Sequence, residues 1–482
     1  MAVEMASAPE ASLWRDPYES VNLPDEKNPV DFSNVKKARV VAAGVAIIVN
    51  SALGSSLPSG AASDIAKEFS VTVPLQLVLL NSIYMLGFAI GPLIFGPLSE
   101  HVGRRLVLIG TYLAYMIFTL CCAVSPTYGT LLLFRLLCGI AAAAPNAVVG
   151  PLFADIYDRP EPRGRSMAYF MCATSMTPPF GPIISGYSTG VSWRLTFWIG
   201  LAIAGVCLPL VVFLPETYVP VLKKKYARKK GDDISLELPC PEKKKYQLLQ
   251  ELGTIFSRPF VMITREPVVL FSALYLALIY STLYLFFQAY PIIFQDTPPS
   301  IDKMIVTAGS VLALVIFLWY SAYHSSAMKA GAPWAAKIEY RRLPLACAGG
   351  PMIVISLFWL GWTAYPGIHP AVPAVSGLFF GTGYLIIFIA LLNYITDAYR
   401  QFSASAQASA STLRSITAVC LPLAAPQMYN KLGVQWACSL LAFVTLGLAL
   451  IPFVFIRYGE ALRKRSPFCQ KLAQAPSMIV AA

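Results

Sequence analysis

The chain has 482 residues, of which 56% are hydrophobic and 13% charged, and its formal net charge is +12. Its mean hydropathy is +0.61. About a quarter of the residues of a soluble domain are charged, so this composition excludes an ordinary soluble protein and indicates a polytopic membrane protein. The ten cysteines form no C-x-x-C pair and no cluster with histidine, so the sequence supports neither a zinc site nor a disulfide framework.

Apolar windows long enough to cross a bilayer occur twelve times, in two groups of six. They lie at residues 40–57, 73–98, 106–124, 128–150, 167–190 and 195–214, and then at 268–294, 304–323, 343–364, 371–396, 409–429 and 435–456. We therefore expect an all-α membrane protein with twelve transmembrane helices in two six-helix bundles. The expected parts are a disordered tail at 1–37, an N-terminal bundle at 38–214, a central loop at 215–266, a C-terminal bundle at 267–456 and a second tail at 457–482.

The basic residues predict the orientation of the chain in the membrane. Most of the 37 Lys and Arg fall in the two tails, the central loop and the other segments on the same side, while the opposite loops hold only Lys67, Arg194, Lys303 and Lys431. Cytosolic loops carry such an excess, so both termini are expected in the cytosol. The lysine triplets of the central loop then serve as topology signals and contacts to anionic lipids, and no nucleic-acid partner is expected.

Two six-span halves joined by a basic linker are typical of secondary transporters that bind substrate between the halves. The span count excludes a seven-span receptor. A channel is a distant alternative, because the sequence shows no repeat that resembles an ion-selectivity filter. A membrane enzyme is equally distant, because His101, His324 and His369 are far apart in the sequence and form no catalytic cluster. The chain has no G-x-x-x-x-G-K-(S/T) motif, which disfavours an ATP-driven pump. We expect no catalytic residue, metal site or cofactor.

Ten residues directly after the second span, Gly96 to Arg105, read Gly-Pro-Leu-Ser-Glu-His-Val-Gly-Arg-Arg. Charges at the end of a span are kept where they are paired or functional. The spacing resembles the loop between spans two and three of the major facilitator superfamily of secondary transporters. This resemblance implies an inner latch of Glu100, Arg104 and Arg105, with Gly96 and Gly103 permitting the close turn. A plain positive-inside anchor is the alternative for the two arginines.

Further segments, over about residues 38 to 468, resemble the fungal drug:proton antiporter-1 branch of this superfamily, including its polyamine-transporter-like members. In span five, Gly-Pro-Ile-Ile-Ser-Gly is similar to the antiporter motif. The likeness implies a gating role for Gly181, Pro182 and Gly186, since small residues let helices approach and proline bends a span. An ordinary packing seam is the alternative. Thr177 and Ser185 stand where glycines are usual, so the motif is incomplete.

Two arginines, Arg135 in span four and Arg414 in span eleven, are the main candidates for a substrate site. An arginine within an apolar span is expected to face the protein interior or an aqueous cavity, although Arg135 is shallow enough to snorkel. Other polar or aromatic side chains predicted to line the cavity are Asn50, Tyr284, Gln288, Tyr290 and Asn393, with Asn81, Tyr84 and Asn146 as further candidates. Each of these could instead form a hydrogen bond between helices.

The charge pattern within the spans predicts the class of substrate. The middle of the spans holds two arginines and no apparent carboxylate, because Asp155, Asp158 and Asp397 fall near cytosolic ends. Unpaired positive charge in a low-dielectric cavity favours anions or neutral molecules with hydrogen-bond acceptors. We expect export of an organic acid, such as an itaconate-like dicarboxylate, or of an acidic or neutral secondary metabolite. A broad-specificity multidrug efflux pump is the alternative.

The resemblance implies that export is coupled to the proton gradient and occurs at the plasma membrane. We expect a monomer whose partners are the small-molecule substrate and membrane lipids.

Overall fold

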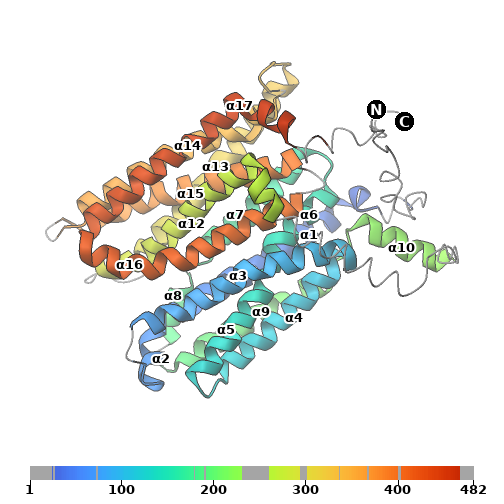
Figure 1. Ribbon diagram of the computed structural model, residues 1–482. Coiled ribbons are helices and arrows are strands. Elements are labelled where there is room, and N and C mark those ends of the chain that lie inside the picture. Colours follow the sequence, from blue (N-terminus) through green and yellow to red (C-terminus); the bar gives the residue numbers. More distant parts are fainter. Residues whose placement is uncertain are drawn as a thin grey trace, which may run out of the picture.

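The computed structural model describes residues 24, 28–71, 74–178, 180–188, 191–230, 260–293, 301–335, 337–365, 368–399, 403–466 and 470. Within these ranges the chain is helical and contains no strand. Figure 1 shows two bundles of long helices lying side by side, one built from the N-terminal half and one from the C-terminal half. The predicted fold class, an all-α membrane protein with two helical bundles, is confirmed.

The N-terminal bundle begins with a helix whose start is capped by a side chain. Ser33 accepts a hydrogen bond from the backbone N–H of Lys36 at the start of the first helix. Thr127 and Ser192 cap two later helices in the same way. The helices of this bundle are α1 (Asn34–Ser56), α2 (Ala62–Glu68), α3 (Pro74–Val102), α4 (Arg104–Ala123), α5 (Tyr128–Ala142), α6 (Ala144–Ile156), α7 (Pro160–Met176), α8 (Phe180–Ser188) and α9 (Trp193–Val212).

The C-terminal bundle follows α10 (Val219–Lys230), which lies in the predicted central loop. Its helices are α12 (Pro267–Ile293), α13 (Ile301–Lys329), α14 (Ile338–Thr363), α15 (Ala371–Tyr399), α16 (Ser403–Leu448) and α17 (Ile451–Arg465). Helix α16 includes the predicted span at 409–429 and the first part of the span at 435–456, which continues into α17, and its backbone leaves the helical region at Gly433, where φ is 73°. Glycine adopts this left-handed conformation more readily than any other residue.

Ten helical segments are long and apolar enough to cross a membrane by themselves, within the described residues. The predicted spans at 167–190 and 409–429 are not among them. The first is divided between α7 and α8, and the break lies between Met176 and Phe180. We expected Pro182 to bend this span, but the helix is interrupted earlier, where the consecutive prolines 178 and 179 lack backbone N–H donors. Pro182 lies inside α8.

The two bundles contact each other through a few helix pairs. Helix α3 packs against α16, α7 packs against α13 and α15, and α6 packs against α16. Thr412 on α16 donates a hydrogen bond to the backbone carbonyl of Ala89 on α3 at 3.1 Å. The candidate cavity at the centre of the molecule is lined from α1, α3, α6 and α7 of one half and from α12, α15 and α16 of the other.

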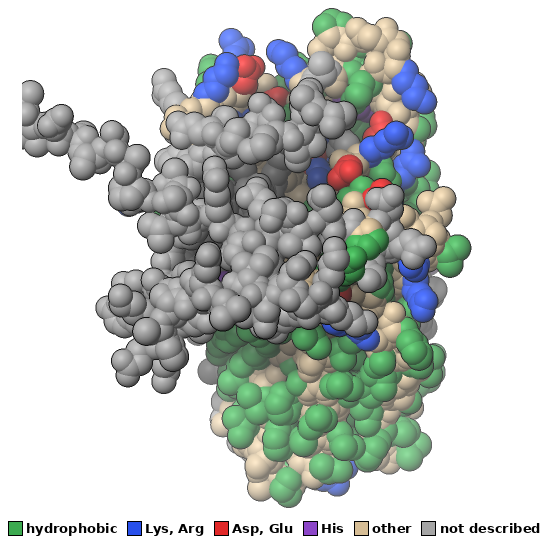
Figure 2. All heavy atoms as spheres, turned by 90° about the vertical axis from the view of Figure 1, so that its right-hand side faces the viewer, with side chains coloured by type: hydrophobic (Ala, Val, Ile, Leu, Met, Phe, Trp, Pro, Cys, Tyr) green, Lys and Arg blue, Asp and Glu red, His purple; other side chains and the backbone are tan. Residues whose placement is uncertain are grey.

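The outer flanks of the bundles are apolar. Val206, Trp319 and Leu106 are exposed to 82%, 68% and 60%. Figure 2 looks onto the end of the molecule where α10 lies and shows charged side chains on this face, with hydrophobic side chains covering the flank below it. This distribution matches a bilayer around the flanks and water at the end, so the chain is a multi-pass membrane protein. We call the charged end the α10 end.

Candidate substrate cavity and gate

A small cavity lies between the two bundles. Its lining comes from both halves, and the residues are Ile48, Ala52, Ser55, Phe88, Asn146, Thr174, Pro178, Tyr280, Leu283, Tyr284, Tyr384 and Arg414. The cavity volume is about 10 Å³, room for roughly one water molecule. The site is therefore closed in this structure, and a substrate larger than water enters only after the two halves move apart.

Arg414 is the cationic group of this cavity. Its side chain is 7% exposed, and its guanidinium lies over the rings of Tyr280 at 4.9 Å and Phe388 at 5.4 Å. Its Nη2 atom donates a hydrogen bond to the Ser411 hydroxyl at 3.4 Å, while its Nε atom is buried without a partner. Within the described part of the chain, Arg414 forms no ion pair with a carboxylate.

The other predicted cavity residues differ in their placement. Tyr284 lines the cavity, and its hydroxyl lies 3.2 Å from that of Tyr280. Asn50 and Asn393 are buried and donate to carbonyls of their own helices, those of Ala46 and Ile389, at 2.9 and 2.8 Å. Neither asparagine belongs to the lining of the cavity. The side chains of Gln288 and Tyr290 lie outside the described residues, although both positions fall within α12.

Arg135 joins three helices of the N-terminal bundle. It is 1% exposed and donates hydrogen bonds to the backbone carbonyls of Gly54 at 2.7 Å, Ser55 at 3.3 Å and Leu80 at 3.2 Å. Its guanidinium also lies 4.4 Å from the centre of the Tyr84 ring. Because it satisfies carbonyls at the end of α1 and in α3, it fixes these helices beside α5. Its predicted role in substrate binding stays a prediction.

The turn between α3 and α4 is held by a carboxylate that the sequence did not point to. Glu216, after α9, accepts hydrogen bonds from the backbone N–H groups of Arg104 at 3.0 Å and Arg105 at 3.2 Å. It thereby caps the N-terminus of α4, where negative charge is favourable. Gly103 has a φ of 105°, and a Cβ there would lie 2.9 Å from the carboxyl carbon of Glu216.

The two latch arginines have different partners. Arg104 is buried, forms an ion pair with Asp155 of α6 at 3.3 Å and donates to the Ser99 hydroxyl at 2.6 Å. Arg105 is exposed and donates to the carbonyl of Val212 at 3.3 Å. These bonds tie α3, α4, α6 and α9 together within one half. The latch function assigned to them, to Glu100 and to Gly96 stays a prediction.

An ion pair crosses between the two halves at the α10 end of the molecule. Arg163 of α7 is paired with Asp397 of α15, and Arg342 of α14 approaches the second oxygen of Asp397 at 3.5 Å. The side chains of Asp397 and Arg342 are 5% and 3% exposed. Breaking a buried pair of this kind by removing one partner leaves an uncompensated charge. The cluster Arg163–Asp397–Arg342 therefore holds the halves together near the α10 end, and we call it the inter-half cluster.

Sequence reasoning missed this cluster. Asp397 was noted only as a charge near a cytosolic end, and Arg163 and Arg342 were counted only as basic loop residues. The sequence does show a carboxylate at the end of one span and arginines at the starts of others, which are the residue types that such a cluster needs. Nothing in the sequence indicates which of these ends meet.

The antiporter-like segment of α8 packs closely against α1. A Cβ at Gly181 would lie 2.7 Å from the backbone carbon and 2.8 Å from the Cβ of Ser56. At Gly186 a Cβ would meet nothing within 4 Å. The close approach of α8 to α1 therefore depends on Gly181 and not on Gly186. The gating role of these two residues and of Pro182, whose side chain lies outside the described residues, stays a prediction.

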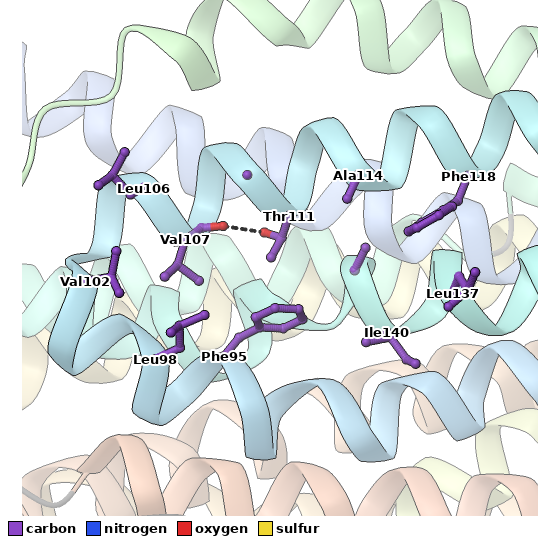
Figure 3. A pocket seen from close by; sticks show the side chains of 12 residues that line it. Phe95, Leu98, Val102, Leu106, Val107, Thr111, Ala114, Phe118, Leu137 and Ile140 are labelled. Atoms are coloured by element: carbon purple, nitrogen blue, oxygen red, sulfur yellow. Dashed lines mark hydrogen bonds between the residues drawn. The ribbon is translucent and has the colours of Figure 1, made fainter. Parts of the chain in front are cut away.

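A larger groove of about 340 Å³ lies between α3, α4 and α5 (Figure 3). It opens on the flank of the bundle, since Leu98, Val102 and Leu106 of its lining are exposed. The lining is apolar except for Thr111, whose hydroxyl donates to the carbonyl of Val107 in its own helix at 2.7 Å. The groove offers no free polar group to orient a substrate, and its position on the flank is that of a lipid-facing surface.

Comparisons with known proteins agree with this architecture. The model of the family described as Major Facilitator Superfamily matches residues 44–419. The chain is 35% identical to the MFS-type transporter traF of Penicillium crustosum over 92% of both chains. It is 33% identical to the major facilitator superfamily multidrug transporter mdrA of Aspergillus fumigatus, over 95% of this chain and 76% of that protein.

Solved structures show the same fold at low sequence identity. The proton:xylose symporter XylE is matched with a TM-score of 0.65 and 14% identity, over 88% of this chain and 97% of that one. The human organic anion transporter MFSD10 is matched with a TM-score of 0.57 and 18% identity, over 86% and 98%. Helical architecture, a closed cavity between two bundles, the family match and the fungal relatives agree: the chain belongs to the major facilitator superfamily and is a membrane transporter of that family.

Proposed function

We propose that the protein exports a small organic acid, or an acidic or neutral secondary metabolite, from the cell. The observation that carries this proposal is Arg414, a buried cation in the cavity between the halves with no carboxylate partner among the described residues. The lining residues include no Asp or Glu. An uncompensated positive charge in a low-dielectric site penalises cations and favours anions.

Export rather than uptake is supported by relatives. An efflux pump of Fusarium oxysporum is 33% identical over 96% of this chain and 79% of that protein. A transporter from the ascochitine biosynthesis cluster of Didymella fabae is 31% identical over 93% and 88%. We further propose that the carrier works as a monomer in the plasma membrane, with both termini in the cytosol, and that the proton gradient drives export.

Alternating access is the proposed mechanism. The inter-half cluster closes the α10 end, α3 and α16 are bonded to each other further along the boundary, and the cavity in the centre is shut. Opening towards the cytosol requires the Arg163–Asp397 pair to separate, so that substrate reaches Arg414. Rocking of the halves then presents the same cavity to the other side.

The test is a comparison of secreted metabolites. A strain lacking this gene is grown beside the parent strain and a strain in which the wild-type gene is restored, and the medium and cell extracts are profiled. Export of a dedicated product predicts that one acidic or neutral compound disappears from the medium, accumulates in cells and returns to the medium on restoration. Adding a protonophore to the parent strain is expected to reproduce the loss. Unchanged secretion would contradict the proposal.

A broad-specificity multidrug pump is the second candidate. It is supported by the relative in Aspergillus fumigatus, which is named as a multidrug transporter, and by the aromatic side chains of the cavity, which are Phe88, Tyr280, Tyr284 and Tyr384. Aromatic walls accept ligands of varied shape. This candidate predicts that the deletion strain becomes sensitive to many unrelated compounds, whereas a dedicated exporter predicts no such change.

A further inference from the structure

We propose that Arg414 and Asn146 form a two-sided binding site for a carboxylate, in which each half of the transporter supplies a hydrogen-bond donor. This inference rests on the proposed export function and specifies the chemical group that the site recognises. Arg414 lies on α16 of the C-terminal half and Asn146 on α6 of the N-terminal half, and both line the same cavity.

Both residues present a donor that the protein leaves unused. The Nε atom of Arg414 and the Nδ2 atom of Asn146 are buried and have no hydrogen-bond partner. A buried donor without a partner is costly, so such groups are rare in folded proteins and call for an explanation. A ligand with hydrogen-bond acceptors would pair with both of these donors beside the cavity, which explains their presence.

The surroundings of Arg414 contrast with those of the other described arginines that are buried. Arg104 is paired with Asp155, Arg342 approaches Asp397, and Arg135 donates to three backbone carbonyls. Arg414 instead has aromatic faces beside it and one long bond to a hydroxyl. Its charge is therefore left for a ligand, and a planar carboxylate matches the fork geometry of a guanidinium.

Arg414 and Asn146 line the same cavity from opposite halves, so a carboxylate admitted when the halves move apart is placed between them. A ligand bound to both connects the halves. It therefore stabilises the state in which the halves enclose it, and binding is expected to raise the thermal stability of the whole transporter. The rings of Tyr280 and Phe388 beside the guanidinium favour an apolar or aromatic body next to the carboxylate.

The experiment measures thermal unfolding of the purified full-length protein in lipid nanodiscs by intrinsic tryptophan fluorescence. The probes are benzoate and itaconate, each compared with its uncharged amide, benzamide and itaconic diamide. The site predicts that both carboxylates raise the unfolding temperature in a saturable manner and that the amides do not.

Two variants test the residues separately. Arg414→Gln is expected to weaken the carboxylate response by about 10-fold or more, since hydrogen bonds to charged groups are the strong ones. Asn146→Asp adds a carboxylate to the cavity itself, so it is expected to abolish the response while keeping the protein folded. Arg457→Gln, which removes the same charge from an exposed position on α17, is the matched control and should respond as wild type does.

The outcomes separate this inference from the export function. Equal responses of wild type and both cavity variants, or no response of wild type to either carboxylate, would overturn the carboxylate site. If wild type and Arg414→Gln export a neutral or cationic compound equally well, export stands and the carboxylate site is wrong. If the deletion strain secretes all of its metabolites normally, the export proposal itself fails.

Discussion

Gly103 shows how one residue position determines the turn at the α10 end. Its φ of 105° is unfavourable for other residues, and an added Cβ would lie 2.9 Å from the carboxyl carbon of Glu216. Gly103→Ala is therefore expected to lower the free energy of unfolding by about 1–3 kcal/mol and to reduce transport. Gly110→Ala, where a Cβ meets nothing within 4 Å, is the control. Equal thermal unfolding curves for the two variants would contradict this account of the turn.

Arg135 is the second test at the scale of a residue. Arg135→Ala removes the donor of the three bonds to the carbonyls of Gly54, Ser55 and Leu80, so unfolding in detergent is expected at a lower temperature. We also expect transport to be lost while the protein still reaches the cell surface. Immunoblots of surface protein and uptake or export kinetics check this, and normal kinetics would remove Arg135 from any functional role.

At the scale of the helices, α8 and α1 make the closest contact of the antiporter-like segment. Gly181→Ala places a Cβ against the backbone of Ser56, whereas Gly186→Ala meets open space. The first variant is expected to slow transport and to lower the unfolding temperature, and the second to behave as wild type. Paired measurements of transport rate and thermal unfolding test this. A loss in Gly186→Ala equal to that in Gly181→Ala would show that close packing is not what the motif provides.

The helices were largely predictable from the sequence, and their meeting points were not. A bilayer imposes length and apolarity on every span, so spans such as 106–124 correspond to a helix in the structure, Arg104–Ala123. The charged residues at the turn between α3 and α4 could also be recognised in the sequence. In contrast, Arg163 and Asp397 are 234 positions apart, and hydrophobic patterning says nothing about which charged ends meet across the two halves. The capping role of Glu216 depends on the same kind of distant contact.

The whole molecule is a pair of bundles that meet around a closed cavity. The Arg163–Asp397 pair crosses between the halves, and the α7–α13 and α3–α16 contacts lie along the same boundary. Packed interfaces of this kind have discrete arrangements and do not deform continuously. The state of the transporter is therefore expected to depend on whether the inter-half cluster is intact.

Asp397→Asn removes the carboxylate that both Arg163 and Arg342 contact. The two arginines then repel each other without compensation, so the α10 end is expected to open. Because the halves rock about the central cavity, the opposite end is expected to close at the same time. Glu460→Gln, which removes a carboxylate from an exposed pair with Lys464 on α17, is the control and should leave both ends unchanged.

The most direct test of this account is a measurement of spin-label distances in nanodiscs, for wild type, Asp397→Asn and Glu460→Gln in a cysteine-free background. One label pair, at Leu106 and Tyr323, reports on the α10 end, and a second, at Val124 and Trp436, reports on the opposite end; all four positions are exposed. We predict that Asp397→Asn lengthens the first distance and shortens the second. Unchanged distances, or changes in the same direction at both ends, would contradict alternating access controlled by the inter-half cluster.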